Sequence, residues 1–148
     1  MFGAIGVLVC SILATLSWIV FLGGFGHFNV NLGGPIVGHD SIRFYFPAVA
    51  TPILVILLVV LAIMYFLKTT TATALVNFVL TGITIAILFT TIIFLGTIVH
   101  ELSVIYSAGL TTDHFVNTYF AGALMEIIFL GLAFMFLNMA SLFTNVEE

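Results

Sequence analysis

Four long apolar stretches dominate the chain, and each is close to the length needed to cross a lipid bilayer. They cover about residues 2–25, 44–67, 74–99 and 116–143, with more polar segments between them. A membrane-spanning helix needs roughly 20 apolar residues at a rise of about 1.5 Å per residue. Strands of a membrane barrel would instead alternate between polar and apolar residues. The pattern therefore predicts an all-α polytopic membrane protein, with four transmembrane helices bundled into one domain over residues 1–148.

The connections between the four predicted spans differ in length. Residues 68–73 form a tight link, which makes the second and third spans antiparallel neighbours. Residues 26–43 and 100–115 are expected to be two long loops, and the first of them is rich in turn-forming residues. Within the second, residues 101–107 are expected to form a short interfacial helix. Both long loops are predicted to lie on the side of the membrane opposite the two termini.

Charged side chains are too few for a protein surrounded by water. They make up 5% of the chain, and 63% of the residues are apolar, whereas a soluble domain typically carries about 25% charged residues. Lipids and other integral membrane proteins are therefore the expected partners. With Arg43 and Lys68 as the only basic side chains besides histidine, nucleic-acid binding through phosphate neutralisation is excluded. By the positive-inside rule, their placement slightly favours cytoplasmic termini.

Small and weakly polar residues mark two faces on which neighbouring helices are expected to approach closely. Such residues recur at helical spacing in the first and third spans. They are Gly3, Cys10, Ala14 and Ser17 in the first span and Asn77, Thr81, Thr84 and Thr91 in the third. In the second span, Pro52 lies beyond the first turn, where its missing N–H group predicts a kink or a small cavity.

Glu126 is the sharpest candidate for a functional residue. It lies about ten residues into the fourth span, where a carboxylate costs a few kcal/mol and should face the protein interior or be protonated. Tyr119 lies two turns away on the same face, with Gly122 between them. The pair is consistent with a proton- or ion-accepting pocket, or with a polar contact for a quinone. The alternative is a structural neutral acid, hydrogen-bonded to a threonine or to Asn77 of a neighbouring helix.

The four histidines form a second candidate site because all of them fall on the long-loop side. They are His27, His39, His100 and His114, with Asp40, Glu101 and Asp113 nearby in the sequence. Imidazole and carboxylate groups together are suitable ligands for zinc or copper. Since His27 and His100 end two different spans, a haem at the membrane edge is another hypothesis. The alternative is a set of interfacial histidines, and no spacing matches a recognised metal motif, so the sequence requires no cofactor.

Three functions follow from these features. We favour a small, non-catalytic accessory subunit of a multi-subunit integral membrane complex, most plausibly a respiratory or redox assembly, which assists proton or quinone access. The preference for redox assemblies rests on how common they are. The first alternative is a small proton- or ion-coupled transporter or channel that uses Glu126. The second is a membrane redox protein that binds haem or metal through its loop-side histidines.

Overall fold

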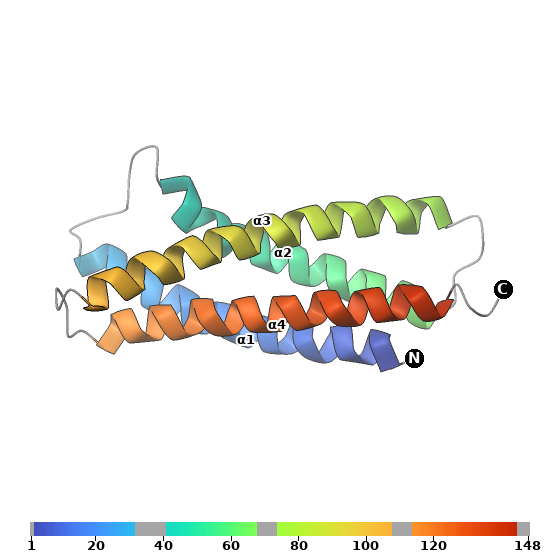
Figure 1. The fold of residues 1–148 in the computed structure, drawn as a ribbon, viewed down its shortest axis with the longest axis horizontal. Helices are drawn as coiled ribbons and strands as arrows, with labels where there is room; N and C mark the ends of the chain where they lie inside the picture. The colour runs from blue at the N-terminus through green and yellow to red at the C-terminus, as the bar shows by residue number, and fades with distance from the viewer. Residues whose placement is uncertain (1, 32–40, 68–73, 108–113, 145–148) are drawn as a thin grey trace.

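The protein consists of four long α-helices and matches the predicted fold class. The computed structural model describes residues 2–31, 41–67, 74–107 and 114–144. The helices are α1 (Phe2–Asn31), α2 (Ser41–Phe66), α3 (Ala74–Ser107) and α4 (His114–Thr144). Each contains a stretch that is long and apolar enough to cross a membrane. The part of the chain that the structure describes is therefore a bundle of four candidate membrane spans (Figure 1).

The helices extend further than the apolar pattern predicts. Residues 26–31, expected in a loop, continue α1, and residues 101–107, expected in a separate short helix, continue α3. Glycine and asparagine favour turns, but neither removes a helical hydrogen bond, and the first residue after α1 that cannot donate one is Pro35. Likewise, α3 meets no glycine or proline between Gly96 and its end at Ser107. With 34 residues, α3 is about 51 Å long at about 1.5 Å per residue.

The direction of the chain alternates from helix to helix, as the loop lengths predict. The beginning of α1 and the end of α4 lie at one end of the bundle, together with the α2 and α3 ends that residues 68–73 connect (Figure 1). The opposite end holds the helix termini that precede and follow the two longer connections. The predicted placement of the termini opposite these connections is thus confirmed.

Each helix buries one narrow stripe whose members are spaced alternately three and four residues apart. In α1 the stripe includes Val7, Cys10, Ala14, Ser17 and Phe21, and in α4 it includes Tyr119, Ala123, Glu126, Leu130, Ala133 and Leu137. This is the spacing of helices that pack at small angles with interdigitating side chains. The small-residue face predicted for the first span is part of this stripe, and Glu126 is a full member of the stripe in α4.

Glycine allows α1 and α4 to approach each other closely along most of their length. A Cβ atom added to Gly3 would lie 2.7 Å from the backbone nitrogen of Ala140. At the other end, a Cβ at Gly24 would lie 2.5 Å from the backbone of Tyr119, and one at Gly122 would lie 2.5 Å from the backbone of Phe21. These antiparallel pairs keep one register from end to end. The α1–α4 pair is accordingly the most extensive helix contact in the bundle.

The outward surface of the bundle is apolar, as a lipid environment requires. Large side chains such as Ile12 on α1, Ile56 on α2 and Ile93 on α3 are more than half exposed. Only 22% of the span in α3 is buried, compared with 33% in each of the other three spans. Because lipid tails are as apolar as these side chains, packing and hydrogen bonds determine which face of each helix turns inward.

We predict that Gly122→Ala destabilises the bundle, whereas Gly131→Ala does not. The new methyl group at position 122 would collide with the Phe21 backbone, which cannot move as a flexible side chain can, so the free energy of unfolding should fall by about 1–3 kcal/mol. A Cβ at Gly131 meets nothing within 4 Å. Denaturation in mixed detergent micelles, followed by circular dichroism, measures both values. Equal effects at the two positions would contradict the close α1–α4 contact.

Candidate functional site

Glu126 lies at the centre of the bundle and is joined by a hydrogen bond to a neighbouring helix. Its side chain is fully buried on α4, and the hydroxyl of Thr51 on α2, also fully buried, donates a hydrogen bond to Oε1. The sequence suggested a threonine or Asn77 as a partner, and the donor is a threonine. The other carboxyl oxygen, Oε2, is buried and has no hydrogen-bond partner among the described residues.

Thr51 differs from most hydroxyl-bearing residues of this bundle in where its hydrogen bond goes. The hydroxyls of Ser17, Thr84 and Thr91 donate to the carbonyl four residues earlier in their own helices. Such bonds meet the hydrogen-bonding requirement of the hydroxyl within its own helix, so no second helix is needed. The Thr51 hydroxyl instead reaches across to α4. A cross-helix bond of this kind fixes the rotation of α2 relative to α4 at the depth of Glu126.

A second cross-helix hydrogen bond lies one turn away and follows directly from Pro52. Proline has no N–H group, so the carbonyl four residues earlier, at Ala48, loses its usual helical partner. The indole Nε1 of Trp18 on α1 donates to this Ala48 carbonyl at 2.9 Å. In a membrane, a carbonyl without a donor is costly. Trp18 therefore completes the hydrogen bonding of α2 at the position where the proline interrupts it.

Tyr119 belongs to an aromatic cluster between Glu126 and the long-connection end of the bundle. It is fully buried, and its ring centroid lies 5.0 Å from that of Phe21 and 5.7 Å from that of Phe25. Phe25 in turn packs edge-on against Tyr45 of α2, at 5.2 Å. Tyr119 and Glu126 share the buried stripe of α4, as predicted.

The predicted histidine site is only partly within the described residues. His27 is partly buried near the end of α1, and His100 is exposed on α3. His114 begins α4, and His39 lies outside the described residues. Within the described ranges, no group of three or more His, Cys, Asp or Glu side chains is placed to share a metal ion. The proposed metal and haem sites at these histidines remain predictions.

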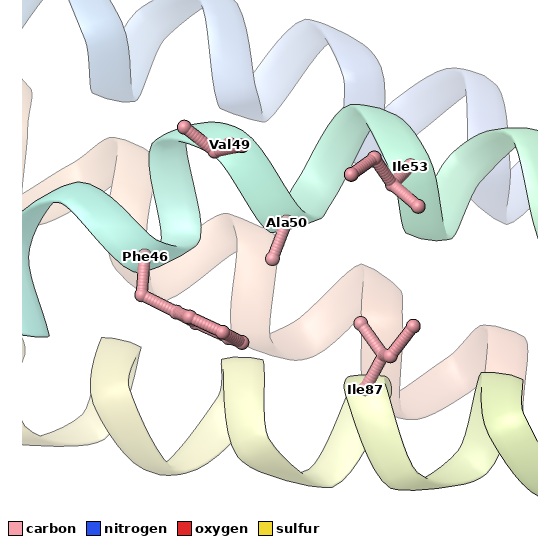
Figure 2. A pocket seen from close by; sticks show the side chains of 5 residues that line it. All are labelled: Phe46, Val49, Ala50, Ile53 and Ile87. Carbon is pink, nitrogen blue, oxygen red and sulfur yellow. The ribbon is translucent and has the colours of Figure 1, made fainter. Parts of the chain in front are cut away.

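Two cavities flank α2 near Pro52. One, of about 210 Å³, lies between α1 and α2 and is lined by Thr15, Trp18, Thr51, Pro52, Val55 and Ile56. The other, of about 170 Å³, lies between α2 and α3, where Phe46 and Ile87 point toward each other from the two helices (Figure 2). The cavity expected from Pro52 is thus present on the α1 side, and Thr51 is among the residues that line it.

No protein-family model, curated protein or solved structure matches this chain. Function must therefore be inferred from the bundle itself, which contains a buried carboxyl group, its threonine donor and a pocket beside that threonine.

Glu126 and Tyr119 stand out in the sequence, whereas Thr51 and Trp18, which make hydrogen bonds between helices, do not. Pro52 did contain a usable clue, because its position shows that the Ala48 carbonyl needs a donor from elsewhere. Trp18 is the only tryptophan in the chain, and an indole N–H in a membrane span also needs an acceptor. The two requirements match each other. The pairing of Thr51 with Glu126 depends on the relative rotation of α2 and α4, which the sequence pattern does not provide.

We predict that Thr51→Val lowers the free energy of unfolding by about 1–3 kcal/mol, because Glu126 loses a buried donor. Thr51→Ser, which keeps the hydroxyl, should recover most of that loss. Thr84→Val is the matched control, since Thr84 is equally buried and its hydroxyl donates to the Leu80 carbonyl of its own helix. When that hydroxyl is removed, the Leu80 carbonyl still accepts its backbone hydrogen bond, so no buried group is left without a partner. Detergent denaturation of the three variants measures the values. A Thr84→Val effect as large as that of Thr51→Val would argue against a special role for the Glu126 bond.

We also predict that Trp18 and Pro52 are energetically coupled through the Ala48 carbonyl. Trp18→Phe should destabilise the wild-type chain, because the Ala48 carbonyl loses the indole donor. In a Pro52→Ala background the same substitution should cost less, since alanine restores an N–H group to the helix. A double-mutant cycle should give a coupling of about 1 kcal/mol. Additive effects would show that the indole hydrogen bond does not compensate for the proline.

Proposed function

We propose that this chain is a non-catalytic subunit of a multi-subunit integral membrane assembly, of the respiratory or redox class, and that α3 packs against a transmembrane helix of another subunit. The observation that carries the proposal is an exposed face of small residues on α3. Gly82, Ala86 and Thr90 follow one another at four-residue intervals, and all three are exposed. Small residues at this spacing are typical of sites where membrane helices approach closely.

The packing inside the bundle supports this interpretation of the α3 face. Gly3, Gly24 and Gly122 are buried, and each adjoins the backbone of a neighbouring helix. Gly82, in contrast, has nothing within 4 Å of the place where a Cβ would be. The Thr90 hydroxyl donates to the Ala86 carbonyl at 2.9 Å. The Thr90 hydroxyl therefore needs no acceptor from a partner helix. The α3 face thus has the composition of an internal contact, but no helix among the described residues lies against Gly82.

Within such an assembly, Glu126 would assist proton movement in the membrane. It is a fully buried carboxyl group near the middle of the candidate span Val116–Ala140, and intramembrane carboxyl groups commonly serve in proton relays. The redox chemistry itself would belong to a cofactor-bearing partner. The same carboxyl group also favours a second candidate function, a proton- or ion-coupled transporter formed by this chain alone.

The test is site-specific photo-cross-linking in native membranes, with a benzophenone amino acid placed at Ala86 and, as a control, at Ile12 on the outer face of α1. We expect a discrete product with a different, cofactor-bearing membrane polypeptide from position 86 and lipid adducts only from position 12. Ala86→Trp should reduce co-purification of that polypeptide at least tenfold. A product with a second copy of this chain, or with lipid alone, would contradict the proposal. Proton-coupled flux by the isolated chain in proteoliposomes, abolished by Glu126→Gln, would support the transporter instead.

A further inference from the structure

Ser17 of α1 lies opposite Glu126 in the register of the α1–α4 pair. A Cβ atom at Gly122 would lie 2.5 Å from the backbone nitrogen of Phe21, so these two residues face each other. Because α1 and α4 are antiparallel, Ser17, four residues before Phe21, comes to the level of Glu126, four residues after Gly122. The glycine contacts at the two ends of the pair keep the same register. Ser17 is 2% exposed and Glu126 is fully buried, so both side chains lie inside the bundle.

The hydroxyl of Ser17 can accept a hydrogen bond but has no proton to offer Glu126. Its proton is used in the bond to the Leu13 carbonyl, at 2.9 Å. A hydroxyl oxygen also has two lone pairs that can accept hydrogen bonds. Thr51 has the opposite role, because its hydroxyl donates to Oε1 of Glu126. The carboxyl group thus has a donor on α2 and a potential acceptor on α1.

This pair of neighbours matches a protonated carboxyl group and not an ionised one. A protonated carboxyl group has one O–H donor and a carbonyl acceptor, whereas a carboxylate can only accept. Thr51 meets the requirement of Oε1. The other oxygen, Oε2, is buried and has no hydrogen-bond partner among the described residues, so a carboxylate would lack a donor there. A buried carboxyl group without a compensating partner usually takes up a proton.

No positive side chain faces Glu126 from the described parts of the four helices. The titratable side chains that come closest to its level within the bundle are neutral or acidic. They are Cys10 on α1, Tyr45 on α2, Glu101 on α3 and Tyr119 on α4. His100 on α3 is exposed and therefore does not face the buried carboxyl group. Arg43 and Lys68 are both at least eight residues from Thr51 in the sequence.

We propose that Ser17, Thr51 and Glu126 form a proton-binding site in the middle of the bundle. Glu126 is protonated in the assembled bundle, with Oε1 accepting from Thr51 and the Oε2–H group donating to the Ser17 hydroxyl oxygen. The second bond forms when the Glu126 side chain turns toward α1. The two hydroxyls are positioning groups, since the proton resides on the carboxyl group. The inference rests on the proposed role of Glu126 in proton movement and deepens it by naming the groups that hold the proton.

Infrared spectroscopy of the full-length chain in lipid nanodiscs at neutral pH tests the proposal. The C=O stretch of a protonated carboxyl group is separate from the bands of carboxylates, and we expect Glu126→Gln to remove it. Ser17→Ala should shift this band to higher frequency, because the carboxyl group loses a hydrogen bond. Ser11→Ala is the matched control and should leave the band unchanged. Ser11 is equally buried on α1 and its hydroxyl donates to the Val7 carbonyl, but it does not lie opposite Glu126.

Glutamine resembles the protonated acid in its hydrogen bonding. Its carbonyl oxygen can accept from Thr51, and its amide N–H can donate to Ser17. Glu126→Gln should therefore keep the melting temperature of the wild type in the same nanodiscs. A large fall in the melting temperature would show that a carboxylate, and not a neutral group, stabilises the bundle.

Two infrared results would overturn the proposal. One is a wild-type spectrum without a protonated-carboxyl band that Glu126→Gln removes, which would show that the group is ionised. The other is a band that Ser17→Ala leaves in place, or that Ser11→Ala shifts equally, which would show that Ser17 is not the partner. If Ser17→Ala does not fold, Ser17→Cys, whose sulfur is a weaker acceptor, should shift the band in the same direction.

The infrared result and the cross-linking result can fail separately. The isolated chain contains all three groups of the proton-binding site, so its spectrum does not depend on a partner at the α3 face. A protonated Glu126 that responds to Ser17→Ala, together with lipid adducts alone from position 86, would contradict the proposed subunit function but not the proton-binding site.

Discussion

The hydrogen bond from Thr51 to Glu126 joins α2 to α4 across the middle of the bundle. Contact between these two helices is otherwise limited, and hydrocarbon offers a buried carboxyl group no other donor. The bond therefore restricts both the depth and the rotation of α2. That rotation also directs the Ala48 carbonyl toward Trp18 of α1. One polar requirement at position 126 thus determines how α2 meets two other helices.

The α1–α4 pair is held by a different principle. Apolar surface gains little from moving between lipid and protein, so shape decides which helices pack together. Gly3, Gly24 and Gly122 remove the side chains that would otherwise keep the two backbones apart. Their spacing fits one antiparallel register, which places the buried stripes of the two helices against each other. Close packing holds this pair, whereas α2 combines close packing against α1 and α3 with hydrogen bonds to α1 and α4.

The sequence was sufficient for features that depend on length and composition, and insufficient for those that depend on helix rotation. Membrane thickness sets the number and approximate length of the spans, so four apolar stretches predicted four helices. The end predicted for the first span was wrong, because the turn-forming residues of 26–31 do not interrupt helical hydrogen bonds. Residues 101–107 were wrongly separated from the third span, because no glycine or proline divides them from it. Glu126 was identifiable because charge is rare in a span. Its partner, Thr51, was not, because many threonines lie in the spans and only the three-dimensional register selects one of them.

These two modes of packing explain why the cavities lie beside α2. Trp18 and Glu126 bind α2 within one turn, at Ala48 and Thr51, and directional bonds of this kind do not require continuous contact on either side. Even so, α2 packs against both α1 and α3, and an open pocket remains on each of these two sides. The glycine contacts that join α1 to α4 lie on another face of α1, so the space beside α2 leaves that pair intact.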